Sequence, residues 1–403
     1  MRVVVRRWGV RRRLRGLRLV SAGVDRVGLG WRPELAAAIF AHLDRIDVVE
    51  VIADDHFAAP RERLRALRTL GSQVPVTLHG VGLGLASREG LERARLTRMA
   101  RLVEAVQPES WSEHLAFVRG GGREIGHLAA PPRVPETVAA VARNVAAARA
   151  LVGSAPLVEN VATLIDPPGS TQAEDEWIVD VLAASGAELL LDLHNLYANA
   201  LNFGFDARAF LARLPAERIA AVHLAGGRWI FAPAAADGRR VVRRLDDHLH
   251  AVPEAVFELL VDVARRAPRP LTVILERDGA YPPFELLLAE LERAREALRL
   301  GRAQGIAAVT VRGREARAPE ASLDLRLSPV DAIPSDAFLA QLYTDPRARE
   351  RVLAEAEAAA LDRPGLELAA ASFALKRRQA EAHRSRRGGR LRSWLRRLKH
   401  AAA

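Results

Sequence analysis

The chain has 403 residues, of which 49% are hydrophobic and 27% charged, so it can bury one large core or two modest ones and is not disordered, collagen-like or coiled-coil as a whole. The net charge of +11 arises at the two ends, because residues 1–26 carry +8 and residues 376–403 carry +10, whereas the body between them carries −7. This negative body disfavours nucleic acid as a partner. The absence of cysteine excludes disulfides, thiolate nucleophiles and cysteine-ligated metal sites.

No uncharged apolar run approaches the roughly 20 residues of a bilayer span, and the Arg-rich first residues lack the apolar core of a secretory signal. The sequence therefore predicts a cytoplasmic protein with no transmembrane segment. We expect residues 1–21 to form a basic N-terminal arm, with an ordered first strand or an over-long predicted start as the alternatives.

Between residues 22 and 300, short runs rich in Val, Ile or Leu alternate with amphipathic stretches, a pattern typical of alternating strands and helices. The predicted strands are 24–28, 46–52, 74–79, 110–117, 156–160, 188–194, 219–224 and 271–276. The clearest predicted helices are 33–43, 88–106, 135–151, 174–184, 253–266 and 283–298. Eight strands close a (β/α)8 barrel, and a doubly wound open sheet is the alternative with the same alternation.

The polar residues at the strand ends favour the barrel. Strand after strand ends in side chains that can bind a metal or a proton: Glu50, His79, Glu113 with His114, Glu159 with Asn160, Asp192 with His194, His223, and Glu276. A barrel brings all carboxyl ends to one face, where barrel enzymes keep their active sites, whereas an open sheet spreads them along an edge. The predicted fold is therefore an α/β TIM barrel over 22–300 with a C-terminal helical extension.

The chain changes character after residue 300. Residues 301–320 are polar and Arg-rich, which indicates a linker, with one more strand predicted over 307–312. Residues 321–403 have helical spacing of apolar residues and end in a basic tail, so we predict a helical C-terminal module. We expect this module either to recognise a leader peptide or dock a partner, or to cover the barrel. Its tail is either solvated or a helix that binds a partner or a membrane surface.

The segment LLLDLHNLY at 189–197 carries a clear chemical signal. Burying Asp192, His194 and Asn195 without partners would cost several kcal/mol. Side chains alternate along a strand, so Asp192 and His194 are expected on one face, within reach of one ion or one substrate atom.

Other strand ends repeat this pattern. His79 enters a Gly-rich loop in PVTLHGVGLGLA, and His223 precedes small residues in AAVHLAGG. After the seventh strand, RRLDDHLHAV offers Asp246, Asp247, His248 and His250. Asp246 and His248 form an i, i+2 pair on one side of an extended segment, with a solvated charged loop as the alternative.

One face of the barrel would thus hold about four His, five carboxylates and an Asn. Carboxylates at this density repel one another unless cations lie between them. Mixed imidazole and carboxylate ligands suit non-haem iron, manganese or zinc better than calcium or magnesium. The sequence therefore predicts a metal site that holds more than one ion.

Several blocks in one order carry a resemblance to a known family: GLGWRPEL (28–35), LHGVGLGL, WSEHLAF, LVEN, LLLDLHNLY, VHLAGG, LDDHLH and ILERD (274–278). With these blocks, residues 22–300 resemble the multinuclear non-haem iron-dependent oxidases, the family of the methanobactin-biosynthesis iron oxidase. The resemblance implies a (β/α)8 barrel that holds two or three iron ions in mixed valence and uses dioxygen as co-substrate. It also implies a ribosomally made precursor peptide as substrate, typically modified at cysteine, and a separate partner protein that presents the peptide.

The resemblance also implies roles for individual residues. The implied iron ligands are His79, Glu113, Asn160, Asp192, His194, His223, Asp246, His248 and Glu276. Asp192, His194 and Glu276 are the implied catalytic residues among them. Further residues expected in or beside the site are Glu50, Asp54, Asp55, His56, His114, Glu159, Asn195, His250 and Asp278.

The chain departs from the family pattern at one place. Where the family commonly reads EVHAEN, this chain reads EVIADDHF at 50–57, with Ile52 at the usual His position. We expect either that Asp54, Asp55 or His56 substitutes for the missing ligand, or that fewer iron ions bind.

Two other functions use similar residues. A divalent-metal sugar isomerase or endonuclease-type barrel also places His, Glu and Asp at strand ends, although the negative body disfavours an endonuclease. A non-catalytic metal-binding protein is the other alternative, and Ile52 is its best support. Oxygen uptake with a cysteine peptide distinguishes the oxidase from a non-catalytic protein.

Overall fold

The computed structural model describes residues 23–231, 242–311 and 345. The predicted basic arm (1–21), the part of the linker beyond residue 311 and, apart from Asp345, the C-terminal module (321–403) lie outside the described residues. Among the described helices, none is long and apolar enough to cross a membrane.

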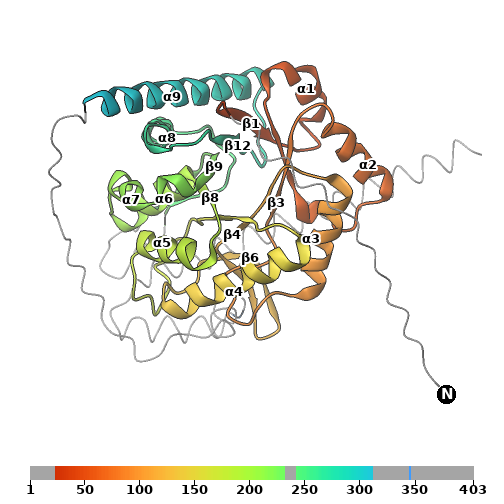
Figure 1. Ribbon diagram of the computed structural model, residues 1–403, viewed down its shortest axis with the longest axis vertical. Helices are drawn as coiled ribbons and strands as arrows, with labels where there is room; N and C mark the ends of the chain where they lie inside the picture. The colour runs from red at the N-terminus through yellow and green to blue at the C-terminus, as the bar shows by residue number, and fades with distance from the viewer. Residues whose placement is uncertain (1–22, 232–241, 312–344, 346–403) are drawn as a thin grey trace, which may run out of the picture.

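Eight parallel strands form a closed barrel, which confirms the predicted TIM barrel and shows that the open-sheet alternative is wrong (Figure 1). Around the barrel the strands follow the order β1-β12-β9-β8-β7-β4-β3-β2. Their bounds are β1 Arg26–Gly30, β2 Val49–Ile52, β3 Val76–Gly80, β4 Trp111–His114, β7 Leu157–Glu159, β8 Leu189–Asp192, β9 Ile219–Leu224 and β12 Thr272–Leu275.

Helices cover the outside of this barrel (Figure 1). They are α1 Ala36–Ala41, α2 Arg61–Leu70, α3 Arg93–Val106, α4 Pro135–Val152, α5 Glu174–Ser185, α6 Leu193–Phe203, α7 Ala207–Arg213, α8 Glu254–Arg266 and α9 Phe284–Val311. Short 3-10 turns occur at Leu43–Arg45, Ala53–His56 and Ala216–Arg218. All six predicted helices are present, whereas α2, α6 and α7 were not predicted.

Helix α9 is longer than the sequence pattern indicates, and the strand predicted over 307–312 is wrong because the helix continues to Val311. Arg302 anchors this extension, since its Nε donates to Asp25 at 2.9 Å and its Nη1 donates to the Ala264 carbonyl at 3.1 Å. A Cβ at Gly301 would lie 2.6 Å from the Ala264 Cβ, so glycine permits α9 to pack closely on α8.

Strand alternation divides the side chains of the barrel into two sets. Val49 and Val51 of β2, like Val222 and Leu224 of β9, belong to the apolar core between the barrel and the helices. The intervening residues point into the barrel, and at the carboxyl ends of the strands these are polar. The last inward residue of β9, for example, is His223, which is fully buried.

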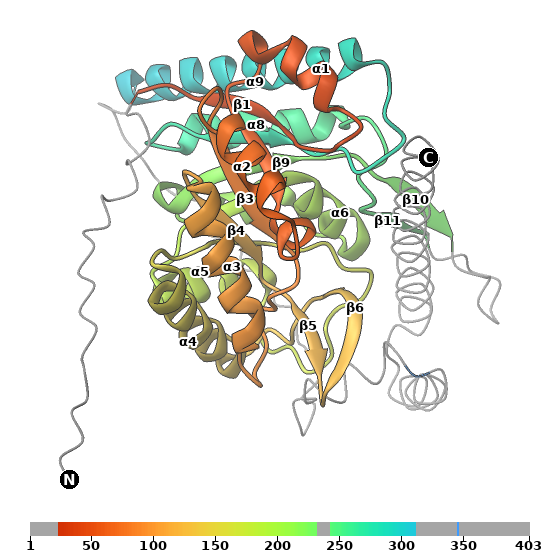
Figure 2. The ribbon, with the colours of Figure 1, turned by 90° about the vertical axis from the view of Figure 1, so that its right-hand side faces the viewer.

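Two antiparallel hairpins extend the barrel at this end. Strands β5 (Phe117–Gly120) and β6 (Arg123–Ala129) follow β4, and strands β10 (Arg228–Phe231) and β11 (Val242–Leu245) follow β9. Figure 2 shows both hairpins on the same side of the barrel. The predicted strand 110–117 therefore ends early, because the chain leaves the barrel after His114 and Phe117 begins the first hairpin.

Candidate metal centre

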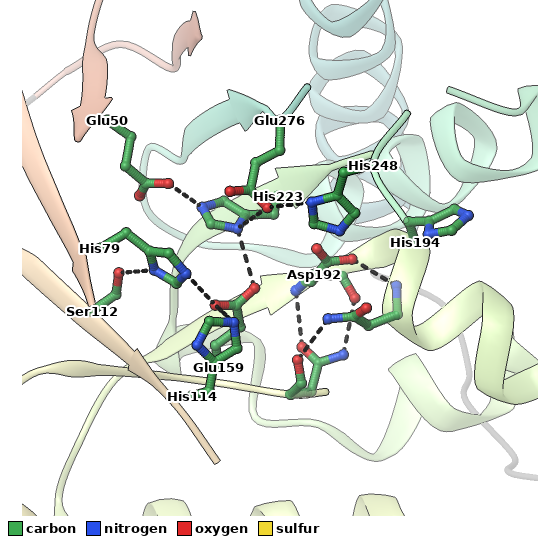
Figure 3. Close-up of polar contacts among 12 residues, drawn as sticks. Glu50, His79, Ser112, His114, Glu159, Asp192, His194, His223, His248 and Glu276 are labelled. Carbon is green, nitrogen blue, oxygen red and sulfur yellow. Dashed lines mark hydrogen bonds and ion pairs between the residues drawn. The ribbon is translucent and has the colours of Figure 1, made fainter. Parts of the chain in front are cut away.

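Inward-facing polar side chains at the carboxyl ends of the strands form one buried cluster (Figure 3). Each belongs to a different strand or directly follows one, and each is exposed by 8% or less. We call the following residues the central cluster: Glu50, His79, His114, Glu159, Asp192, His223 and Glu276.

His223 makes the most contacts within the central cluster. Its Nε2 lies 2.9 Å from Glu50 Oε1. Its Nδ1 lies 3.1 Å from Glu159 Oε1 and 3.2 Å from Glu276 Oε2. Carboxylates thus approach both nitrogens of one fully buried imidazole.

His79 and His114 both direct Nε2 toward Glu159 Oε2, at 3.4 Å and 3.2 Å. Their other ring nitrogens have outer partners: His114 Nδ1 donates to the Gly80 carbonyl at 3.1 Å, and His79 Nδ1 lies 2.8 Å from Ser112 Oγ. A carbonyl only accepts, so His114 carries a proton on Nδ1, and Nε2, which faces Glu159, is the nitrogen that can give up its proton to bind a metal ion. Such outer hydrogen bonds orient metal-binding histidines.

A second group of contacts adjoins the central cluster, in the segment after β11. His248 Nδ1 lies 3.2 Å from Glu276 Oε2, and its Nε2 lies 2.9 Å from Asp246 Oδ1. The same Asp246 oxygen lies 2.6 Å from His194 Nδ1. Asp246 and His248 are therefore close together, as predicted, although the positive φ of 55° at His248 shows that the chain turns there.

These contacts shift pKa values strongly. Burial alone would lower the pKa of His114, but nearby carboxylates, Glu159 above all, raise it to about 9. Burial is likewise outweighed at His223, where the surrounding carboxylates raise the pKa well above its usual range. Burial and the neighbouring Asp246 raise the pKa of Asp192. Protons or metal ions are therefore needed to balance the carboxylates in this water-poor site.

Several buried atoms of the site make no hydrogen bond within the described part of the chain: Glu50 Oε1, Glu159 Oε2, Asp192 Oδ2, His194 Nε2, His223 Nε2 and His248 Nε2. A buried polar group without a partner costs about 1–3 kcal/mol. Two ligands at right angles, each about 2.1 Å from a metal ion, lie about 3 Å apart. The 2.9 Å between Glu50 and His223 and the 3.2 Å between His114 and Glu159 match this spacing, so the residues fit metal ions.

Three overlapping groups of ligand atoms, each within 4.8 Å of one another, can be defined among the described residues: Glu50, His79 and His223; His79, His114 and Glu159; and Glu159, Asp192, His223 and Glu276. His79, Glu159 and His223 each belong to two groups. Shared members place the groups side by side, as in a centre with more than one ion.

Glu113 and Asn160, both implied ligands, do not join the central cluster. Glu113 Oε2 accepts a hydrogen bond from the Leu83 amide at 3.1 Å. Asn160 binds the backbone of Asp192 twice, donating to its carbonyl and accepting from its amide, each at 2.9 Å. Their polar atoms are therefore occupied by backbone groups.

Strand alternation explains why the neighbours of these two residues lie in the cluster instead. Trp111 of β4 and Val158 of β7 belong to the core outside the barrel. His114 is three residues beyond Trp111, and Glu159 is one beyond Val158, so both point inward. The apolar residues of the two strands were the sequence signal that could have assigned His114 and Glu159 to the centre.

The prediction that Asp192 and His194 share one face of a strand is wrong. Strand β8 ends at Asp192, and His194 lies in the first turn of α6. Asp192 caps this helix, and its Oδ1 accepts a hydrogen bond from the Asn195 amide at 2.6 Å. In Figure 3 the His194 ring points away from Glu159 and His223. Among the described residues, His194 is therefore connected to the site through Asp246.

The departure at Ile52 leaves an apolar side chain paired with His79 across β2 and β3. Asp54, which the sequence offered as a substitute, accepts a hydrogen bond from a backbone amide at 2.8 Å. Asp55 and His56 line a separate cavity of about 260 Å³. Among the described residues, none of the three belongs to a group of ligand atoms.

The remaining predicted residues lie at the edge of the site. Asp278 pairs with Arg32 and lies 3.5 Å from His248. Burial would raise the pKa of Asp278, but Arg32 and His248 lower it to about 2. His250 is exposed and pairs with Asp247 at 2.9 Å. Arg32 was not predicted, since nothing in its local sequence indicates an ion pair with a residue so distant in the chain.

A cavity of about 380 Å³ opens onto the site. Its wall includes His79, His114, Glu159, His248 and Glu276, and residues of β6, of the loop 161–165 and of the segment 244–249 line its outer part. This volume suits a small ligand or a few side chains of a larger one. The cavity therefore gives a ligand access to the central cluster from the side of the two hairpins.

Comparison with known proteins assigns the chain to a family. A family model described as RiPP precursor modification enzyme MbnB/TglH/ChrH matches residues 26–299. The chain belongs to this family. RiPPs are ribosomally made peptides that are modified after synthesis, so the family acts on precursor peptides. The matched residues contain every strand of the barrel and the whole central cluster, and the match confirms the family resemblance seen in the sequence.

Two curated relatives belong to the UPF0276 proteins. One from Streptomyces avermitilis is 36% identical over 292 residues, which are 70% of this chain and 56% of that protein. One from Caulobacter vibrioides is 32% identical over 285 residues, which are 70% of this chain and 98% of that protein. The chain thus matches about half the length of the Streptomyces relative.

Solved structures resemble the chain in fold only. The match to the structure of an L-ribulose 3-epimerase covers 73% of this chain and 100% of the epimerase chain, at a TM-score of 0.46 and 13% sequence identity. A xylose isomerase domain protein from Planctomyces limnophilus covers 71% of this chain with 100% of its own, at a TM-score of 0.43 and 13% identity.

Proposed function

We propose that this protein is an iron- and dioxygen-dependent oxidase that modifies residues, above all cysteines, of a ribosomally made precursor peptide. Membership of a RiPP precursor modification family supports the peptide substrate. The observation that carries the proposal is the central cluster, where buried ring nitrogens and carboxylate oxygens face one another at 2.9–3.4 Å and several make no hydrogen bond. Such a set of atoms needs protons or metal ions to balance its charge, and metal ions also occupy the atoms that make no hydrogen bond.

The proposed ligands of these cations are the seven residues of the central cluster, with Asp246 and His248 at its edge. Imidazole and carboxylate without sulfur suit iron, and the resemblance described above implies iron. Bound iron would supply the one-electron chemistry that dioxygen requires and would lower the pKa of a coordinating thiol.

The protein's own residues prepare the site for this chemistry. The Gly80 carbonyl and the Ser112 hydroxyl hold the rings of His114 and His79, so that each Nε2 faces the interior. Arg32 and Asp278 form an ion pair beside His248. The cavity admits a peptide side chain, while the burial of the cluster excludes bulk water. The lack of cysteine leaves no protein thiol to compete with a substrate thiol.

The test is oxygen uptake together with the mass of the peptide. Iron-loaded full-length protein, with a cysteine-containing precursor peptide and its presenting partner protein, is expected to consume dioxygen and change the peptide mass. Both signals should stop when serine replaces the peptide cysteine and when zinc replaces iron. Modification that proceeds without dioxygen, or equally fast with zinc, would contradict the proposal.

A further inference from the structure

Two arginines line the cavity among the described residues, Arg32 and Arg244, and they differ in their partners. Arg32 pairs with Asp278. Arg244 lines the cavity but forms no ion pair with a carboxylate of the described residues. Its Nε is buried and makes no hydrogen bond in this part of the chain. Among the described residues, Arg244 is therefore a cation in the cavity wall that pairs with no carboxylate.

Neighbouring residues hold Arg244 in place. Asn202 of α6 accepts a hydrogen bond from the Arg244 amide at 2.6 Å and donates to its carbonyl at 3.0 Å. The guanidinium packs against two aromatic rings, 5.9 Å from the centroid of Tyr197 and 5.7 Å from that of Trp229. Trp229 is also its cross-strand partner in the β10–β11 hairpin. A guanidinium fixed in this way loses little entropy when it binds an anion.

Arg244 is also close to the metal-binding groups along the chain. Asp246, two residues further on, lines the same cavity and contacts His194 and His248. Two residues of extended chain span about 7 Å. An anion bound by Arg244 would thus lie within a few peptide residues of a side chain that contacts the central cluster.

We infer that Arg244, supported by Tyr197, Trp229 and Asn202, is a carboxylate-binding subsite for the peptide substrate. This inference rests on the proposed function for its substrate class. A guanidinium binds a carboxylate through two parallel hydrogen bonds, which fixes orientation as well as position. The carboxylate is either the C-terminus of the peptide or an acidic side chain next to the modified residue, and both sources present the same group.

Binding of short peptides to the full-length protein tests this inference by peptide-observed NMR. Three probes contain serine in place of cysteine: acetyl-Gly-Ala-Ser with a free C-terminus, the same peptide as its C-terminal amide, and acetyl-Gly-Glu-Ser amide. We expect at least one carboxylate probe to bind about ten- to a hundredfold more tightly than the neutral amide. The carboxylate probe that binds more tightly than the neutral amide identifies the source of the carboxylate.

Two variants assign the effect to Arg244. Arg244→Gln should remove the preference for a carboxylate, and Arg244→Lys, which keeps the charge but loses the planar fork, should keep part of it. Arg243→Gln is the matched control, because it removes the same charge from the adjacent position of β11, which does not line the cavity. The Arg243→Gln variant should prefer the carboxylate probes as strongly as the wild type does. Unfolding curves of all variants establish that they fold.

A preference that survives in Arg244→Gln would overturn the inference, as would a wild-type protein that prefers neither carboxylate probe at millimolar concentration. The serine probes make the result independent of oxidation. Loss of oxygen uptake with an intact carboxylate preference would therefore count against the proposed oxidase alone, and the reverse result would count against the subsite alone.

Discussion

Two sets of buried polar side chains lie next to each other at the carboxyl end of the barrel, and they differ in how their polar atoms are used. Asn160, Asn199 and Asn202 bind backbone groups with both ends of their amides. We call these three the asparagine set. In the central cluster, by contrast, atoms such as Glu50 Oε1 and His223 Nε2 face each other without a hydrogen bond.

This difference separates structural from functional burial. A buried amide that satisfies loop backbone stabilises the fold, whereas buried carboxylates packed around imidazoles need protons or metal ions to balance their charge. The asparagine set fastens the loop after β7 and strand β11 to α6. The barrel thus holds the walls of the cavity with one set of polar groups and presents the other to a ligand.

Removing His223 should have the largest effect on metal binding. It belongs to two groups of ligand atoms, so His223→Ala is expected to weaken iron binding by at least about a hundredfold, more than the loss of an outer partner causes. Iron titration followed by elemental analysis measures the change. His42→Ala is the matched control, because His42 binds the Ala38 carbonyl away from the cluster. Equal iron content in both variants would show that the central cluster does not differ from other polar groups in metal binding.

A smaller effect on the same quantity is expected from Ser112→Ala. The hydroxyl lies 2.8 Å from His79 Nδ1, and loss of such an outer partner weakens metal binding about ten- to a hundredfold. Ser72→Ala, which removes an exposed hydroxyl bound to the Thr69 carbonyl, is the control. If iron affinity is the same in both variants, the His79 ring does not depend on Ser112.

Asn199→Ala should change stability and leave metal binding intact. Asn199 accepts from the Thr163 amide at 2.9 Å and donates to the Val161 carbonyl at 3.0 Å, and unpaired buried groups cost about 1–3 kcal/mol. Urea unfolding should show a loss of this size, with iron content equal to that of the wild type. A large loss of iron without loss of stability would place Asn199 in the functional set.

The smallest expected effect concerns Glu174, which accepts from Asn199 Nδ2 at 3.0 Å. Burial raises the pKa of Glu174 from 4.5 to about 7, so the folded state keeps a proton that the unfolded state releases. Wild-type stability should therefore fall as the pH rises from 4.5 to about 7. Glu174→Gln should remove that part of the fall. Solvent reaches part of the side chain, so the change should be smaller than for Asn199→Ala. Urea unfolding below and above this window gives the answer, and identical pH profiles would show that Glu174 does not titrate there.

Local sequence patterns sufficed for the barrel and for much of its polar end. The alternation of apolar runs and amphipathic stretches predicted all eight strands, and His79, Asp192, His223 and Glu276 each lie where a strand end places them. The period of two along β4 and β7 also contained enough information to prefer His114 and Glu159 over their neighbours.

Other features depend on contacts that local periodicity does not encode. Asp192 ends a strand and caps α6, so the apolar run 188–194 hides a strand-to-helix boundary. The contact between His194 and Asp246 joins α6 to the segment after β11, 52 positions further along the chain. Arg244 gains its place from the hairpin and from α6 together, so its role follows only from the folded chain.

The most direct test of the central claim is elemental analysis combined with Mössbauer spectroscopy of full-length protein purified without oxygen. The account predicts more than one iron ion per chain, with a spectrum of coupled ferrous and ferric ions. A single zinc or manganese ion per chain, or no bound metal after reconstitution with iron, would contradict it.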